Sequence, residues 1–71
     1  MPEMKYVDST NIEAVGYDPE SLELHVRFAG SGDTYAYYNV PDFVYEELMQ
    51  ADSKGVYLNC QIKGTYEYGK L

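Results

Sequence analysis

The chain has to build its core without covalent or metal cross-links. Cys60 is its single cysteine and His25 its single histidine, so neither a disulfide within the chain nor a four-ligand zinc site can form. At 71 residues the chain stands at the lower limit of what one apolar core can stabilise alone. Nine tyrosines and two phenylalanines favour a dense aromatic core, with self-association into a homodimer as the other route. We therefore expect residues 1–71 to form one domain that needs no metal or other cofactor.

Two turn-forming segments divide the first half of the chain into three strands. The turns are residues 18–21 (Asp-Pro-Glu-Ser) and residues 30–33 (Gly-Ser-Gly-Asp), which are rich in turn-favouring residues. They separate strands expected at residues 12–17, 21–28 and 34–40, which predicts a three-stranded antiparallel meander. In the middle strand a period of two assigns Leu22, Leu24, Val26 and Phe28 to the core face and Glu23, His25 and Arg27 to the wet face.

The first strand and the residues before it carry weaker signals. Strict alternation assigns Ile12 and Ala14 to one face and Val15 and Tyr17 to the other. Gly16 marks a place where another backbone or a large ring comes close, because it has no side chain to fill that space. Residues 1–8 show no periodic pattern, so we expect them to fray.

A helix is predicted over residues 41–51. Pro41 ends the third strand and suits the first turn of a helix. Val44, Leu48 and Ala51 stand four and three residues apart, which makes one apolar stripe. Tyr45 and Met49 widen this stripe, while Glu46, Glu47 and Gln50 face water.

Residues 53–63 fit either a strand or a second helix. Val56, Leu58, Cys60 and Ile62 alternate with polar residues, as in a strand. Leu58 and Ile62 also stand four apart, and Asp52 or Ser53 can cap a helix that begins there. Because Cys60 lies among apolar positions, we expect a buried and unreactive thiol. Residues 64–69 are expected to be extended.

The charge is distributed unevenly along the chain. The formal net charge is −7, which disfavours nonspecific binding to nucleic acid. Residues 1–53 carry eleven acids against Lys5 and Arg27, a net charge of −9, whereas residues 54–71 carry three lysines against Glu67, a net charge of +2. Any anionic ligand is therefore expected at the C-terminal segment.

An ordered set of short motifs resembles the KTSC domain over about residues 8–71. The motifs are Asp8-Ser9-Thr10-Asn11-Ile12, Gly16-Tyr17-Asp18, the Leu22-to-Phe28 strand, Tyr35-Ala36-Tyr37, Val40-Pro41, the Ala51-x-Ser53-x-Gly55-x-Tyr57-x-Asn59 run and Ile62-Lys63-Gly64-Thr65-Tyr66. This family is named after a C-terminal extension of some lysyl-tRNA synthetases and also occurs as free-standing small bacterial proteins. The resemblance favours the second helix, hence an α+β fold with the order β-β-β-α-α and both helices packed on one face. It also implies RNA binding as one function, although Lys63 stands where we expect an arginine.

Two groups of residues are candidates for a nucleic-acid site. Tyr35 and Tyr37 point to one face of their strand, where exposed rings stack on unpaired bases and buried rings line the core. Near the C-terminus, Lys54, Lys63, Tyr66, Tyr68 and Lys70 interleave cations with rings, which suits single-stranded RNA. Arg27 is a further cation, expected to contribute less.

The remaining patterns argue for a binding function rather than for catalysis. Cys60 and His25 lack a third orienting group and an oxyanion signature, so no catalytic residues are predicted. We expect a small accessory module that binds an unknown protein partner, with weak binding of short single-stranded RNA or tRNA as the alternative. A lone cysteine, the lack of a leader pattern and the lack of an apolar run of roughly 20 residues indicate a cytoplasmic chain outside the membrane.

Overall fold

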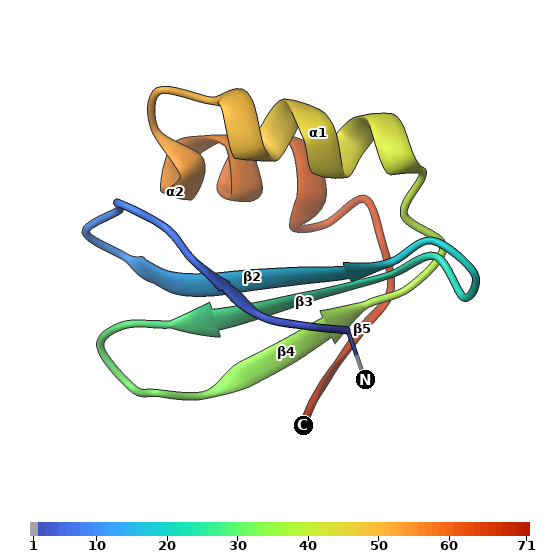
Figure 1. The fold of residues 1–71 in the computed structure, drawn as a ribbon, viewed down its shortest axis with the longest axis horizontal. Helices are drawn as coiled ribbons and strands as arrows, with labels where there is room; N and C mark the ends of the chain where they lie inside the picture. Colours follow the sequence, from blue (N-terminus) through green and yellow to red (C-terminus); the bar gives the residue numbers. More distant parts are fainter. Residues whose placement is uncertain (1) are drawn as a thin grey trace.

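The computed structural model describes residues 2–71 as a five-stranded antiparallel sheet with helices on one face (Figure 1). The strands are β1 (Lys5–Tyr6), β2 (Ile12–Asp18), β3 (Glu23–Phe28), β4 (Thr34–Tyr37) and β5 (Tyr68–Lys70), and they lie side by side in chain order. The helices are α1 (Asp42–Gln50) and α2 (Lys54–Tyr57), and α2 continues into the π-helix η1 (Leu58–Ile62). The predicted α+β class is confirmed, but the predicted three strands are too few.

The two additional strands flank the predicted meander. β1 pairs with β2, with Lys5 opposite Val15, and β5 pairs with β4, with Tyr68 opposite Tyr37. Strands of two and three residues are too short to show a period of two, so the sequence pattern did not reveal them. Part of the N-terminal segment expected to fray is thus paired with β2, and the extended tail is an edge strand.

A β-bulge sets which residues of β2 face the helices. The register between β2 and β3 shifts between Ile12 and Ala14. Ile12 pairs with Phe28 and Val15 with Val26, so Ile12 and Val15 share the core face, and the predicted alternation of β2 is wrong. A bulge inserts one extra residue into the strand, so each side chain before it points to the opposite face from the one that strict alternation predicts.

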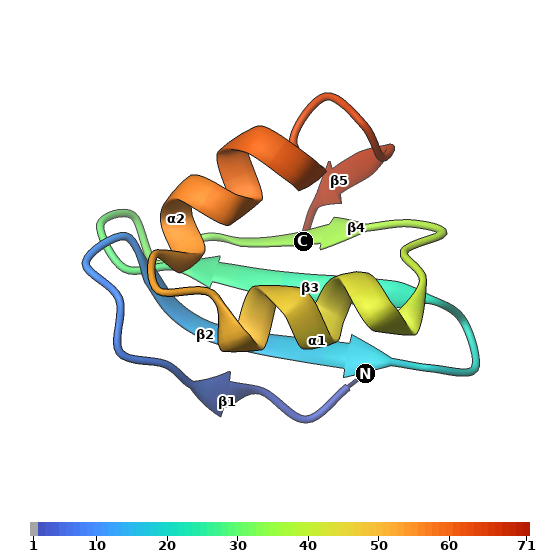
Figure 2. The ribbon, with the colours of Figure 1, turned by 90° about the horizontal axis from the view of Figure 1, so that it is seen from above.

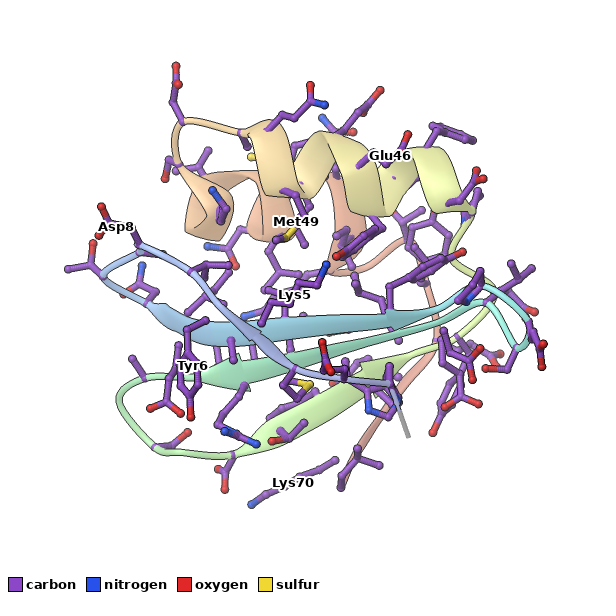
Figure 3. The ribbon with its side chains drawn as sticks, viewed as in Figure 1. Lys5, Tyr6, Asp8, Glu46, Met49 and Lys70 are labelled. Carbon is purple, nitrogen blue, oxygen red and sulfur yellow. The ribbon has the colours of Figure 1, made fainter. Side chains whose placement is uncertain are left out.

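Both helices pack on the predicted core face of β3 (Figure 2). Val44 and Leu48 of α1 are buried, as predicted, and Figure 3 shows Met49 on the sheet side of α1 and Glu46 on the outer side. Leu22 was expected in the core, but it precedes β3 with a φ of 59° and is 38 % exposed. Within residues 2–71, no helix is long and apolar enough to cross a membrane.

Residues 53–63, for which the sequence allowed either a strand or a second helix, form a helix. The Ser53 side chain accepts a hydrogen bond from the Val56 N–H, which caps α2. Leu58 and Ile62 are buried, whereas Cys60 is exposed, so the prediction of a buried thiol is wrong. Two residues along a strand return to the same face, but two residues along a helix turn to the opposite side.

His25 is buried although the strand pattern placed it on the wet face. It is 3 % exposed; Nε2 lies 3.1 Å from Oε1 of Glu23, and Nδ1 has no hydrogen-bond partner. Its neighbour Gly16 explains the burial: a Cβ there would lie 2.8 Å from the Glu3 carbonyl oxygen and the Met4 sulfur. The predicted close approach at Gly16 is confirmed, because the segment before β1 folds over the second face of the sheet.

Cys60 tests the helical phase of this segment. A thiol reagent is expected to label Cys60 in the native protein at a rate near that in denaturant, because the side chain is exposed. As a control, Leu58→Cys in a Cys60→Ser background should label slowly, because position 58 is 1 % exposed. Slow labelling of native Cys60 and fast labelling at position 58 would contradict the helical assignment.

Candidate ligand-binding site

One hollow gathers aromatic residues from three strands around a lysine. It has a volume of about 540 Å³ and is lined by Phe28, Ser31, Tyr35, Tyr37, Lys63, Gly64 and Tyr68; we call it the aromatic hollow. The lining comes from the end of β3, the turn after it, β4, the end of η1 and β5. Four of the eight predicted site residues meet here: Tyr35 and Tyr37 from the sheet, and Lys63 and Tyr68 from the C-terminal segment.

The rings of the hollow pack edge-on and tilted rather than as a flat platform. Tyr35 meets Phe28 in a T-shaped contact with centroids 5.6 Å apart. The Tyr68 ring is tilted against both Tyr35 and Tyr37, at 5.9 and 5.7 Å. Tyr37 is 2 % exposed and belongs to the core, while Tyr68 is 61 % exposed. Tyr37 thus forms the inner wall of the hollow, and Tyr68 forms its open edge.

The π-helix η1 places Lys63 at the rim of the hollow. The wide turn closes with the Lys63 N–H donating to the Leu58 carbonyl at 2.8 Å. The Lys63 ammonium then lies 5.3 Å from the centroid of the Phe28 ring. Gly64 follows with a φ of 82°, a conformation that suits glycine, and redirects the chain toward β5.

The other four predicted site residues lie outside the aromatic hollow. Arg27 Nη1 contacts Glu13 at 3.3 Å, on the face of the sheet opposite the helices. The Lys54 ammonium donates to the Ala51 carbonyl at 3.3 Å. Lys70 pairs with Asp33 at 3.4 Å and extends away from the helices in Figure 3, while Tyr66 packs against the core. Within residues 2–71 the ion pairs thus involve Arg27 and Lys70 but not Lys63.

Sequence reasoning missed three residues of the hollow. Phe28 was assigned to the core, and Ser31 and Gly64 were assigned to turns. These residues come close to the rest of the hollow because β4 pairs with β5. The two strands are more than thirty residues apart in the sequence, and both helices lie between them in the chain. Phe28 could have been recognised from its position as the last residue of β3, at the edge of the core face.

The residues considered for catalysis are not brought together. His25 lies on the sheet face opposite the helices, and Cys60 lies on the outer side of η1. In the part of the chain that the structure describes, no three His, Cys, Asp or Glu residues cluster in a way that could hold a metal ion.

A hydrogen bond between the helices fixes the segment that carries Lys63. The Tyr57 hydroxyl of α2 donates to Oε1 of Glu47 in α1 at 2.7 Å. Burial and this bond to a carboxylate raise the pKa of Tyr57 to about 12, because both disfavour the phenolate. Burial, with Tyr68 and Tyr35 nearby, also raises the pKa of Tyr37.

Comparison with known proteins places the chain in a family. The KTSC domain profile matches residues 8–66, so the chain belongs to the KTSC domain family. A crystal structure of a KTSC domain protein from Yersinia pestis superposes with a TM-score of 0.94 at 34 % identity, covering 100 % of this chain and 99 % of that one. The sequence resemblance and the second helix it favoured are both confirmed.

The similar sequences occur in two settings. A small protein of Tsukamurella paurometabola is 47 % identical over 60 residues, which cover 84 % of this chain and 88 % of that protein. A lysine–tRNA ligase of Nostoc sp. is 43 % identical over 60 residues, which make up only 10 % of the ligase. An uncharacterised protein of Stutzerimonas stutzeri is 38 % identical over 66 residues, 92 % of each chain. The KTSC domain is thus present in small proteins and as a minor part of a ligase.

The raised pKa of Tyr57 predicts how stability depends on alkaline pH. In the unfolded chain tyrosine ionises near pH 10, whereas folded Tyr57 keeps its proton to about pH 12. The contribution of Tyr57 to the free energy of unfolding should therefore be constant up to about pH 10 and fall above it, because the unfolded state loses the Tyr57 hydroxyl proton at lower pH than the folded state. Urea denaturation from pH 8 to 11 measures this, and Tyr57→Phe should make the decline shallower. An unchanged decline in Tyr57→Phe would show that other groups cause it.

Proposed function

We propose that this chain is a non-catalytic binding module for short single-stranded RNA, with the aromatic hollow as its site. The observation that carries the proposal is the convergence of Tyr35, Tyr37, Tyr68 and Lys63 on one hollow. Tyrosine rings stack on bases of any sequence, and a lysine at the rim contacts a phosphate. The volume of about 540 Å³ falls in the usual range for a small-ligand site.

The local charge at the hollow is opposite to that of the chain as a whole. The sequence carries twelve acids, yet within residues 2–71 none lines the aromatic hollow, and Lys63 does. At physiological ionic strength a charge is screened beyond about 8 Å, so the nearby ammonium outweighs distant carboxylates for a phosphate placed there. A long RNA would run over acidic surface, which restricts the ligand to a few nucleotides.

The distribution of the other cations sets the expected affinity. Arg27 and Lys70 are paired with acids, and Lys54 is bonded to a backbone carbonyl, so Lys63 is the main phosphate contact. One such contact and one or two stacked bases support binding in the micromolar range or weaker. The ligases that carry a similar domain are named for tRNA, which gives this chemistry a setting in those proteins.

A protein partner is the second candidate function. The supporting observation is a set of exposed apolar side chains away from the hollow, with Tyr6 77 %, Phe43 57 % and Val56 59 % exposed. Exposed apolar side chains on an acidic body suit a basic protein surface.

Two lysines of the same helical segment provide a matched test of the RNA proposal. In a fluorescence anisotropy titration with a labelled four-nucleotide RNA, Lys63→Met should weaken binding by about fivefold, or ~1 kcal/mol for one exposed charge contact. Lys54→Met removes the same charge outside the hollow and should change affinity much less.

The salt dependence gives a second readout of the same titration. With one phosphate contact the logarithm of affinity should fall against the logarithm of salt with a slope of about −0.7, and Lys63→Met should bring it close to zero. Equal losses for both lysine variants would indicate nonspecific attraction. No binding of the wild-type protein at low salt would reject RNA and leave the protein partner.

A further inference from the structure

A second hollow adjoins the aromatic hollow and has a different chemical character. Its volume is about 270 Å³, and it is lined by Asn11, Phe28, Gly30, Ser31, Gly55, Leu58, Asn59 and Lys63; we call it the polar hollow. Gly55, Asn59 and Lys63 recur every four residues, so one face of the α2–η1 segment forms a wall. Asn11 and the turn at residues 30–31 contribute lining from the sheet side.

Lys63 lies at the boundary of the two hollows. Phe28, Ser31 and Lys63 line both of them, and the Lys63 ammonium lies over the Phe28 ring at 5.3 Å. Such a contact is weak at an exposed position, and the long side chain is flexible. A phosphate placed between the hollows can therefore draw the ammonium off the ring and free the ring face for stacking.

The polar hollow has the groups that recognise the edge of a base. The amides of Asn11 and Asn59 each carry donors and an acceptor, and Phe28 provides apolar surface for a ring. Gly55 lets the Asn11 amide approach the helix, because a Cβ there would lie 3.1 Å from Asn11 Nδ2. Within residues 2–71 no acid lines this hollow either, so nothing in its lining repels a phosphate.

We propose that the two hollows are consecutive nucleotide subsites, so that the ligand is a dinucleotide step of single-stranded RNA. One base stacks in the aromatic hollow, the next base enters the polar hollow against Asn11 and Asn59, and Lys63 binds the phosphate that joins them. This inference rests on the proposed function and adds the length of the ligand, the second base site and the residues that hold it. A dinucleotide has one linking phosphate, and Lys63 is the one lysine that lines both hollows. This match in charge favours a dinucleotide as the ligand.

Calorimetric titration with adenosine monophosphate (AMP) and with the dinucleotide ApA tests the second subsite. ApA should bind about five- to a hundredfold more tightly than AMP, the gain expected for one additional stacked base. Asn59→Ala should lower the ratio of the two affinities by about two- to tenfold, because it removes hydrogen bonds to the edge of the second base and leaves the stacking surface. Gln61→Ala, an exposed amide of the same helical segment outside both hollows, should keep the wild-type ratio.

The outcomes separate the second subsite from the proposed function. Binding of AMP with no gain for ApA would overturn the second subsite and leave the aromatic hollow as a single-base site. Equal reductions of the ratio in both amide variants would also overturn the role of Asn59. Binding of neither AMP nor ApA would overturn both proposals.

Discussion

Two short helices have to cover one face of a five-stranded sheet. α1 has nine residues and lies over β2 and β3, and α2 with η1 has another nine and runs along the β4 side toward β5 (Figure 2). They bury Leu24 and Val26 completely. Toward β5, where the helical cover ends, Tyr35 and Tyr68 fill the space with rings in edge-on and tilted contacts. Rings packed in this way leave a hollow, and the same side chains thus stabilise the fold and make a surface suited to flat ligands.

The backbone at the end of the helical segment places a charge at the rim of this gap. A regular α-helix advances 3.6 residues per turn, but the wide turn of η1 closes from Lys63 back to Leu58. Both Leu58 and Ile62 remain in the core, while Lys63 emerges at the rim, beside Phe28. The charge that the sequence concentrates after residue 53 is thereby divided: one lysine reaches the hollows, and the others do not.

The sequence predicted the local elements of this fold better than their long-range partners. Helix α1 and the meander of β2, β3 and β4 follow from periodicity and turn residues, which act over a few positions. The burial of His25 did not follow, because it depends on the N-terminal segment crossing Gly16. The exposure of Cys60 did not follow either. In a strand Cys60 would share the buried face of Leu58 and Ile62, whereas in a helix it lies on the opposite side. The sequence could not predict which candidate residues come together: with β4 paired to β5, Tyr35, Lys63 and Tyr68 meet while Tyr66 packs inward.

The proposed function requires that a ligand occupy the rings around Lys63. Photo-crosslinking of a four-nucleotide RNA containing 4-thiouridine, followed by mass spectrometry of the peptides, tests this directly. We expect crosslinks on Tyr35, Tyr68 or Phe28, with loss of the signal when unlabelled ApA competes. Crosslinks confined to exposed rings elsewhere, such as Tyr6 and Phe43, would contradict it.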